Sequence, residues 1–232
     1  MDKRWSIYID IEGFGALYDK ENIILLALGD LMEGIFLIGS KCYPETPNRI
    51  FAHQTGDGFV IVSEFYSESL EIPVAISIAL LRHISLRGRF AKASIAEGEF
   101  AGIEGCYPRR IQEAKETDNR VFMGRGIMTI FPVMGTALIN SVAISKVSPS
   151  GSLLTICKGN SDRLPKGCII HEIEGSEVSS IDWVHSSFPL LEQVQNKAEL
   201  RKPDSSTIKT NFYKYFNLFG FNSPQLAAII GG

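Results

Sequence analysis

Residues 6–15 read SIYIDIEGFG, and the rest of the chain is organised around this stretch. It is a short apolar strand that ends in one carboxylate, Asp10, with a Gly-Phe turn directly after it. Residues 51–62, FAHQTGDGFVIV, read as a β-hairpin whose tip is Gly56-Asp57-Gly58. Each acidic residue stands at a strand end beside glycine. We therefore expect the two carboxylates to meet on one edge of a sheet.

The hydrophobic pattern around these stretches predicts an α+β fold. The order strand, helix, strand, strand, helix, strand resembles a ferredoxin-like core, an antiparallel-rich sheet with helices on one face. Residues 98–105 are expected to form a glycine-punctuated loop, and residues 107–125 a charged surface excursion. The expected strands are 5–11, 49–54, 59–65, 89–96, 127–131 and 153–157, and the expected helices are 17–39, 72–85 and 135–147.

The pattern weakens after residue 158. Residues 186–200 read as a helix, and residues 211–218 are rich in aromatic side chains. We predict one domain at residues 1–158 and a C-terminal extension, residues 159–232, packed on it.

Composition narrows the class of protein. With 45% hydrophobic and 21% charged residues, the 232-residue chain reads as a globular protein with a substantial core. A net charge of −3 argues against a general nucleic-acid binder. No apolar run reaches the roughly 18 residues that a membrane-spanning helix needs. No signal peptide is visible, so we expect a cytoplasmic protein with reduced thiols at its four widely spaced cysteines, Cys42, Cys106, Cys157 and Cys168.

Asp10 and Asp57 have the chemistry of a two-metal site. Mg²⁺ and Mn²⁺ prefer oxygen ligands, often one or two carboxylates completed by water and substrate phosphates. The backbone carbonyl of Ile11 offers another ligand, and the amides around Gly13 and Phe14 offer a place for phosphate oxygens. The alternative is structural, with Asp10 capping the helix that follows and Asp57 serving the hairpin turn.

Four stretches, in order, resemble the motifs of class III nucleotide cyclases. Residues 7–14, IYIDIEGF, resemble the first metal motif of that family, and residues 56–59, GDGF, resemble the second. Residues 93–105, ASIAEGEFAGIEG, resemble its strand and glycine loop, and residues 131–138, FPVMGTAL, its next strand–helix junction. The resemblance covers roughly residues 5–157.

The resemblance implies an enzyme that binds a nucleoside triphosphate and works as a head-to-tail homodimer with active sites at the interface. Asp10, Asp57 and the Ile11 carbonyl would bind two Mn²⁺ or Mg²⁺ ions. Gly13 and Phe14 would contact the substrate. The partner subunit would supply base recognition and transition-state contacts. The 3′-hydroxyl of the substrate would attack its own α-phosphorus and expel pyrophosphate.

The chain departs from the purine cyclases at the positions that read the base, which fall here on His53 and Pro132. Proline offers no side-chain donor or acceptor. The places of the family's transition-state Asn and Arg fall on Ile139 and Ala143, and Asn140 stands one step away as the candidate catalytic amide. Arginines of the excursion are candidates for the missing cation: Arg109, Arg110, Arg120 and Arg125.

These departures resemble the pyrimidine cyclases of Pycsar anti-phage defence, whose cyclic nucleotide acts on a separate membrane effector. They favour UTP as substrate, with His53 or Gln54 reading the base and cyclic UMP as product. CTP stays open, because His53 can present either a donor or an acceptor. A degenerate domain that binds nucleotide without turning it over is the other alternative.

Overall fold

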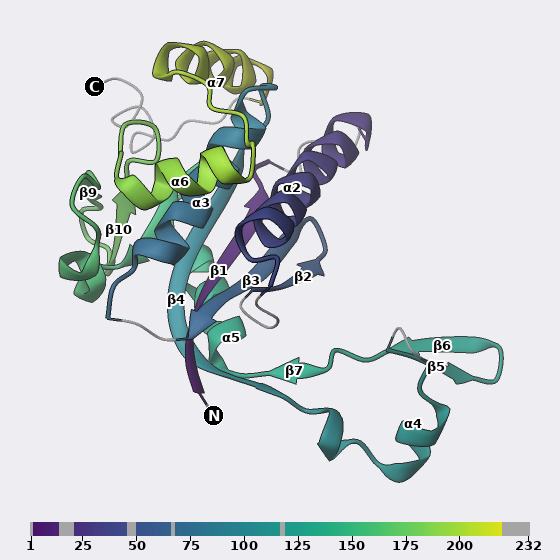
Figure 1. Ribbon diagram of the computed structural model, residues 1–232. Coiled ribbons are helices and arrows are strands. Elements are labelled where there is room, and N and C mark those ends of the chain that lie inside the picture. Colours follow the sequence, from purple (N-terminus) through teal and green to yellow (C-terminus); the bar gives the residue numbers. More distant parts are fainter. Residues whose placement is uncertain (1, 14–20, 46–49, 66–67, 117–118, 220–232) are drawn as a thin grey trace.

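Strand β1 (Asp2–Ile11) lies inside an eight-stranded sheet, as the sequence predicts (Figure 1). In the computed structural model its neighbours are β3 and β4, both antiparallel to it. The strand order is β2-β3-β1-β4-β8-β10-β9, and β7 pairs with β4. Only the pairing of β4 with β8 is parallel among the named strands. The α+β class and the antiparallel-rich sheet are therefore confirmed. The structure describes residues 2–13, 21–45, 50–65, 68–116 and 119–219.

The hairpin and the helices around β1 lie where the sequence places them, within a few residues. The strands are β2 (Phe51–Thr55), β3 (Gly58–Phe65), β4 (Ala91–Gly102), β5 (Arg120–Met123), β6 (Gly126–Thr129), β7 (Val133–Met134), β8 (Leu154–Cys157), β9 (Ile170–Glu172) and β10 (Val178–Ile181). The helices are α2 (Glu21–Cys42), α3 (Glu71–Ser85), α4 (Arg109–Ala114), α5 (Thr136–Val147), α6 (Pro189–Lys197) and α7 (Ser205–Phe219), with 3₁₀ turns η2 (Glu104–Cys106) and η3 (Lys158–Arg163). None of the helices, over the residues described, is long and apolar enough to span a bilayer.

The two faces of the sheet differ in chemistry. Successive side chains of a strand point to opposite faces, so β1 separates its isoleucines from its polar residues. Ile7, Ile9 and Ile11 are buried in the core with the apolar residues of α2 and α3. Tyr8 and Asp10 alternate with them and belong to the other face.

Helix α5 packs against that second face, so the expected arrangement with every helix on one face is wrong in this respect. Ser94 Oγ on β4 donates to the carbonyl of Ser141 at 2.7 Å, and Lys92 Nζ donates to the carbonyl of Ser148 at 2.9 Å. Gly98 permits this approach, because a Cβ there would overlap the backbone of α5. Polar side chains of the sheet thus hold α5 through its backbone.

The segment between β4 and β7 projects from the rest of the molecule (Figure 1). Two expectations fail here. Strand β4 continues through Gly102, where a loop was expected from residue 98. The strand expected at residues 127–131 does not enter the main sheet, because β6 pairs with β5 in a separate two-stranded hairpin.

Residues after 158 contribute to the same sheet. Strand β10 pairs with β8, and β9 pairs with β10. Trp183 is fully buried and its indole N–H donates to the carbonyl of Ser152 at 2.8 Å. The boundary at residue 158 remains a prediction, but the chain on its two sides shares one sheet and one core.

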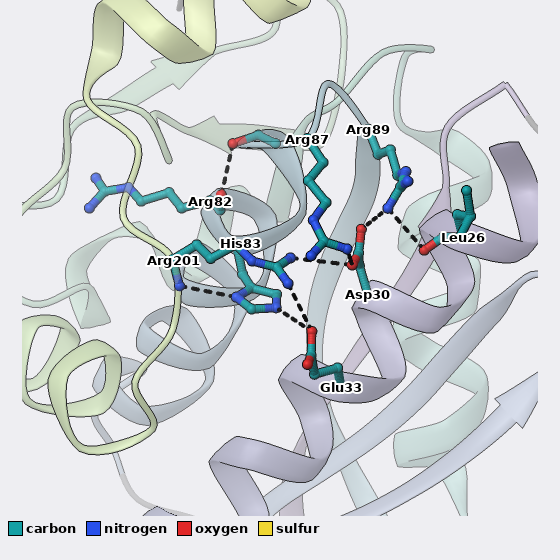
Figure 2. Close-up of polar contacts among 9 residues, drawn as sticks. Leu26, Asp30, Glu33, Arg82, His83, Arg87, Arg89 and Arg201 are labelled. Carbon is teal, nitrogen blue, oxygen red and sulfur yellow. Dashed lines mark hydrogen bonds and ion pairs between the residues drawn. The ribbon is translucent and has the colours of Figure 1, made fainter.

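Ion pairs and a hydrogen bond join the segment that precedes α7 to helices α2 and α3 (Figure 2). Asp30 on α2 is 4% exposed and accepts from Arg87 at 2.8 Å and Arg201 at 3.2 Å, and Arg89 also pairs with it. The backbone N–H of Arg201 donates to Nδ1 of His83 at 3.1 Å. Burial and the nearby Arg201 lower the pKa of His83, which favours the neutral ring.

Candidate active site

Asp10 and Asp57 meet at one edge of the sheet, as the two sequence stretches predict. Asp10 pairs with Gly58 across β1 and β3, directly beside the turn that carries Asp57. The backbone N–H of Ile11 donates to the carbonyl of Asp57 at 3.3 Å. Local sequence makes this possible, because Gly56 has a φ of 64° in the turn and a Cβ at Gly58 would crowd Asp10.

The Asp10 carboxylate is electrostatically unsatisfied. Its Oδ1 atom is buried without a hydrogen-bond partner. Burial, then the neighbouring charges of Asp57 and Glu12, raises the pKa of Asp10 to about 7, and Lys92 opposes the rise. Burial and the charges of Asp10 and Asp57 raise the pKa of Tyr8 to about 12. Lys92 is a cation that faces these acidic groups, and a bound divalent ion would supply further positive charge.

Two carboxylates and one carbonyl fit a divalent ion whose other ligands come from water or phosphate. The orphaned oxygen of Asp10 and the like charge of Asp57 are the observations that support this fit. No group of three or more His, Cys, Asp or Glu side chains arranged to hold a metal is present in the described part of the chain. A cation there would therefore depend on backbone and substrate oxygens as well.

Glu12 and Lys92 adjoin the pair and were not predicted as site residues. Lys92 lies opposite Asp10 on β4, is 9% exposed, and donates to backbone carbonyls at the end of α5. Burial lowers its pKa, while Glu12 and Asp10 raise it. Glu12 Oε1 accepts from the backbone N–H of Gly151 at 2.9 Å. The alternation of small and polar residues along β4 is the sequence signal that could have found Lys92.

Gly13, one of the two residues predicted to contact the substrate phosphates, lies just after the end of β1. Gly13 follows Glu12 with a φ of 76°, a value that favours glycine at the turn. Phe14 lies outside the described residues, so its role stays a prediction.

His53 lies on β2, two strands from β1, on the sheet face that carries Asp10. It pairs with Val60, which in turn pairs with Tyr8. Its ring stacks on Phe131 with 3.7 Å between ring centroids and 29° between planes. Phe131 directly precedes Pro132, so the stack joins His53 to the segment that carries the other predicted base-reading position. Burial lowers the pKa of His53, which favours its neutral ring.

Asn140 lies apart from the two aspartates within one chain. Its Nδ2 donates to the carbonyl of Glu97 at 2.8 Å. Glu97 and Lys92 are five positions apart on β4, or about 17 Å at the rise of a strand. Asn140, Ala143 and Asn160 line an open pocket of about 310 Å³ beside Glu97, near the middle of β4.

Comparison with known proteins finds likeness in structure only. No family model and no curated protein matches the chain. The guanylyl cyclase Cya2 has a TM-score of 0.43 at 9% identity, over 82% of this chain and 97% of that one. A bacterial light-regulated adenylyl cyclase has a TM-score of 0.46 at 12% identity, over 89% of this chain and 57% of its own length.

The guanylyl cyclase domain of the RhoGC fusion protein from the aquatic fungus Blastocladiella emersonii, as a double mutant, has a TM-score of 0.46 at 8% identity, over 78% of this chain and 93% of that one. The chain thus spans just over half of the light-regulated enzyme and almost all of the other two. All three scores lie under 0.5, so the function is argued from the residues of this chain.

Proposed function

We propose that the protein is a nucleotide cyclase that converts UTP to 3′,5′-cyclic UMP and diphosphate. The observation that carries the proposal is the meeting of Asp10 and Asp57 at one sheet edge, with a buried Asp10 oxygen that has no partner. Two carboxylates this close repel each other as anions, and a bound divalent cation would stabilise both in the ionised form.

The chain's own residues would bind and orient the substrate. Asp10, Asp57 and the Ile11 carbonyl would hold two divalent ions, and the amide region at Gly13 would receive phosphate oxygens. The ions, when bound, lower the cost of forming the 3′-alkoxide and offset the charge that develops on the phosphates. The new bond joins O3′ to the α-phosphorus, and the bond from that phosphorus to diphosphate breaks. Lys92 lies beside the pair and lowers the pKa of Asp10, although burial lowers the pKa of Lys92 itself.

A homodimer with its active sites at the interface would place Asn140 at the chemistry. In one chain this amide lies about 17 Å along β4 from Asp10. In a head-to-tail dimer, α5 of one subunit would lie against the sheet edge that carries Asp10 and Asp57 in the other subunit. We propose Asn140 as the group that orients the ribose or the transferred phosphorus from the partner subunit.

The stack of Phe131 on His53 supports a pyrimidine base. The two rings occupy space beside the base-reading positions, and so does Phe51, whose ring centroid lies 5.7 Å from that of Phe131. A one-ring base needs less room there than a purine. Neutral His53 has one donor and one acceptor nitrogen, and it can therefore pair with uracil or, in the other tautomer, with cytosine. We favour UTP and keep CTP as the alternative.

A nucleotide sensor without turnover is the second candidate. One observation favours it: within α5 the only cationic residue is Lys146, so no arginine of this helix serves the transition state. A sensor has less need of both aspartates, which is why the cyclase is our first proposal.

Incubation of the protein with each of the four nucleoside triphosphates and Mn²⁺ tests the proposal. We expect pyrophosphate release and a cyclic product with UTP, and loss of at least 100-fold in rate, on the order of one lost catalytic group, in Asp57→Asn. Asp162→Asn, at an exposed aspartate of η3, is the matched control and should keep wild-type rate. Tight nucleotide binding without turnover would leave the sensor, and turnover by Asp57→Asn would refute the metal site.

We further propose that the cyclic nucleotide is a second messenger in anti-phage defence and acts on a separate membrane effector. The protein itself would act in the cytoplasm. A neighbouring gene for a membrane protein with a cyclic-nucleotide-binding domain would support this role, and purified effector that ignores cyclic UMP and cyclic CMP would contradict it.

A further inference from the structure

The backbone N–H, the backbone carbonyl and the carboxylate of Glu12 each form a hydrogen bond with a different part of the chain. Its backbone N–H donates to the carbonyl of Phe90 at 3.0 Å, and its carboxylate accepts from the N–H of Gly151 at 2.9 Å. Its carbonyl oxygen accepts the hydroxyl of Tyr215. Glu12 is the last residue before the turn at Gly13, so it is the point where the end of β1 is fixed.

These bonds determine where the Ile11 carbonyl points. The C=O of Ile11 and the N–H of Glu12 belong to one planar trans peptide and point in opposite directions. The bond from Glu12 to Phe90 therefore aims the Ile11 oxygen away from β4. The hydroxyl of Tyr215 fixes the next peptide plane, and the two bonds together restrict rotation about Glu12.

Tyr215 comes from α7, more than 200 residues after Glu12 along the chain. Its ring is 5% exposed and packs on Phe90 at 5.1 Å between centroids, and Phe212 packs on the same ring at 5.3 Å. Asn211 Nδ2 donates to the carbonyls of Ser85 and Leu86, each at 3.0 Å, and secures the helix near the end of α3. Helix α7 is thus anchored independently of the bond to Glu12.

From this geometry we propose that α7 sets the affinity of the site for its divalent cation through the hydroxyl of Tyr215. The inference rests on the metal site of the proposed function. Divalent ions of this kind demand near-ideal ligand positions, so a carbonyl ligand that can rotate binds less tightly than one that is fixed. Tyr215 is a positioning residue, because it acts through Glu12 and touches no substrate. Whatever shifts α7 would change the response of the enzyme to metal.

The test compares Tyr215→Phe with Tyr213→Phe, which removes a hydroxyl from an exposed ring of the same helix. Free Mn²⁺ in titrations of the full-length protein is measured by electron paramagnetic resonance. One lost hydrogen bond predicts Mn²⁺ binding about fivefold weaker in Tyr215→Phe and unchanged in Tyr213→Phe. Hydrogen exchange of the metal-free protein should be faster at Glu12 and Gly13 in Tyr215→Phe alone. At saturating Mn²⁺, kcat should stay within about twofold of wild type, because the site re-forms when it is filled.

Unchanged Mn²⁺ affinity in Tyr215→Phe would overturn the inference, even with a lower melting temperature, since the hydroxyl would then be structural only. An equal loss in Tyr213→Phe would overturn it as well. A wild-type protein that binds Mn²⁺ but cyclises no nucleotide refutes the proposed function and leaves the affinity comparison intact. A wild-type protein that binds no Mn²⁺ refutes both.

Discussion

Replacing Asp10 by asparagine should stabilise the metal-free protein while it abolishes activity. Asparagine keeps the shape of the side chain and removes one of two like charges at the sheet edge. The unfolded chain releases the proton of Asp10 near its ordinary pKa of about 3.9, whereas burial and Asp57 hold the folded value at about 7. Between these values the folded protein binds more protons than the unfolded chain. Wild-type stability therefore falls as pH rises through this window and is level above it.

The size of the effect follows from the difference of about three pKa units. At 1.36 kcal/mol per unit the upper limit is about 4 kcal/mol at pH 8. Asp10 is only half-buried and water screens part of its charge, so we expect about 2 kcal/mol. For a chain of this size that is a rise in melting temperature of about 4–8 °C. At pH 5 the gain should be roughly a third as large, because folded wild type is still mostly protonated there.

Thermal unfolding of wild type, Asp10→Asn and the exposed control Asp162→Asn at pH 5 and pH 8 measures the effect. Mn²⁺ should raise the melting temperature of wild type and leave that of Asp10→Asn almost unchanged, because only the ionised pair holds the cation. Either a fall in the stability of Asp10→Asn at pH 8 or a gain that does not depend on pH would refute the electrostatic reasoning. Asp10 would then be a structural residue, such as the helix cap considered from the sequence.

Other residues give further tests. Phe131→Ala should open the space beside His53 and raise the rate with ATP relative to UTP about tenfold; an unchanged ratio in competition assays would contradict the base assignment. Asp30→Asn leaves three arginines without their buried partner and should lower stability by about 3 kcal/mol in urea unfolding, whereas a loss under 1 kcal/mol would show that water replaces the carboxylate. His83, whose pKa is lowered in the folded protein, should make stability fall as pH drops below about 6.5, and His83→Gln should remove that slope. Gly98→Ala should displace α5 and cost a few kcal/mol in thermal unfolding, since its Cβ would overlap helix backbone.

The meeting of Asp10 and Asp57 at one sheet edge could be predicted because its determinants are local. Gly56 and Gly58 fix a tight hairpin, and a hairpin fixes its own register. Once β3 pairs with β1, Asp57 must arrive beside the end of β1, where Asp10 stands. The pattern of alternating apolar residues was sufficient to find both strands.

Contacts between distant parts of the chain could not be predicted in this way. The strands β9 and β10 are three and four residues long, too short for periodicity to reveal them. Their places depend on the pairing of β10 with β8 and of β9 with β10. The stack of Phe131 on His53 joins residues 78 positions apart, and no local pattern encodes it. The hydroxyl of Tyr215 likewise lies in the aromatic-rich residues 211–218, where no local pattern distinguishes one tyrosine from another.

The shared sheet has a consequence for anyone who would shorten this protein. If the chain stopped at residue 158, β8 would lose β10 and become an exposed edge strand, with unpaired backbone N–H and C=O groups facing solvent. The loss of Trp183 would at the same time open the apolar interior next to Ser152. Such a fragment would recruit strands from other molecules and precipitate, however intact its acidic pair.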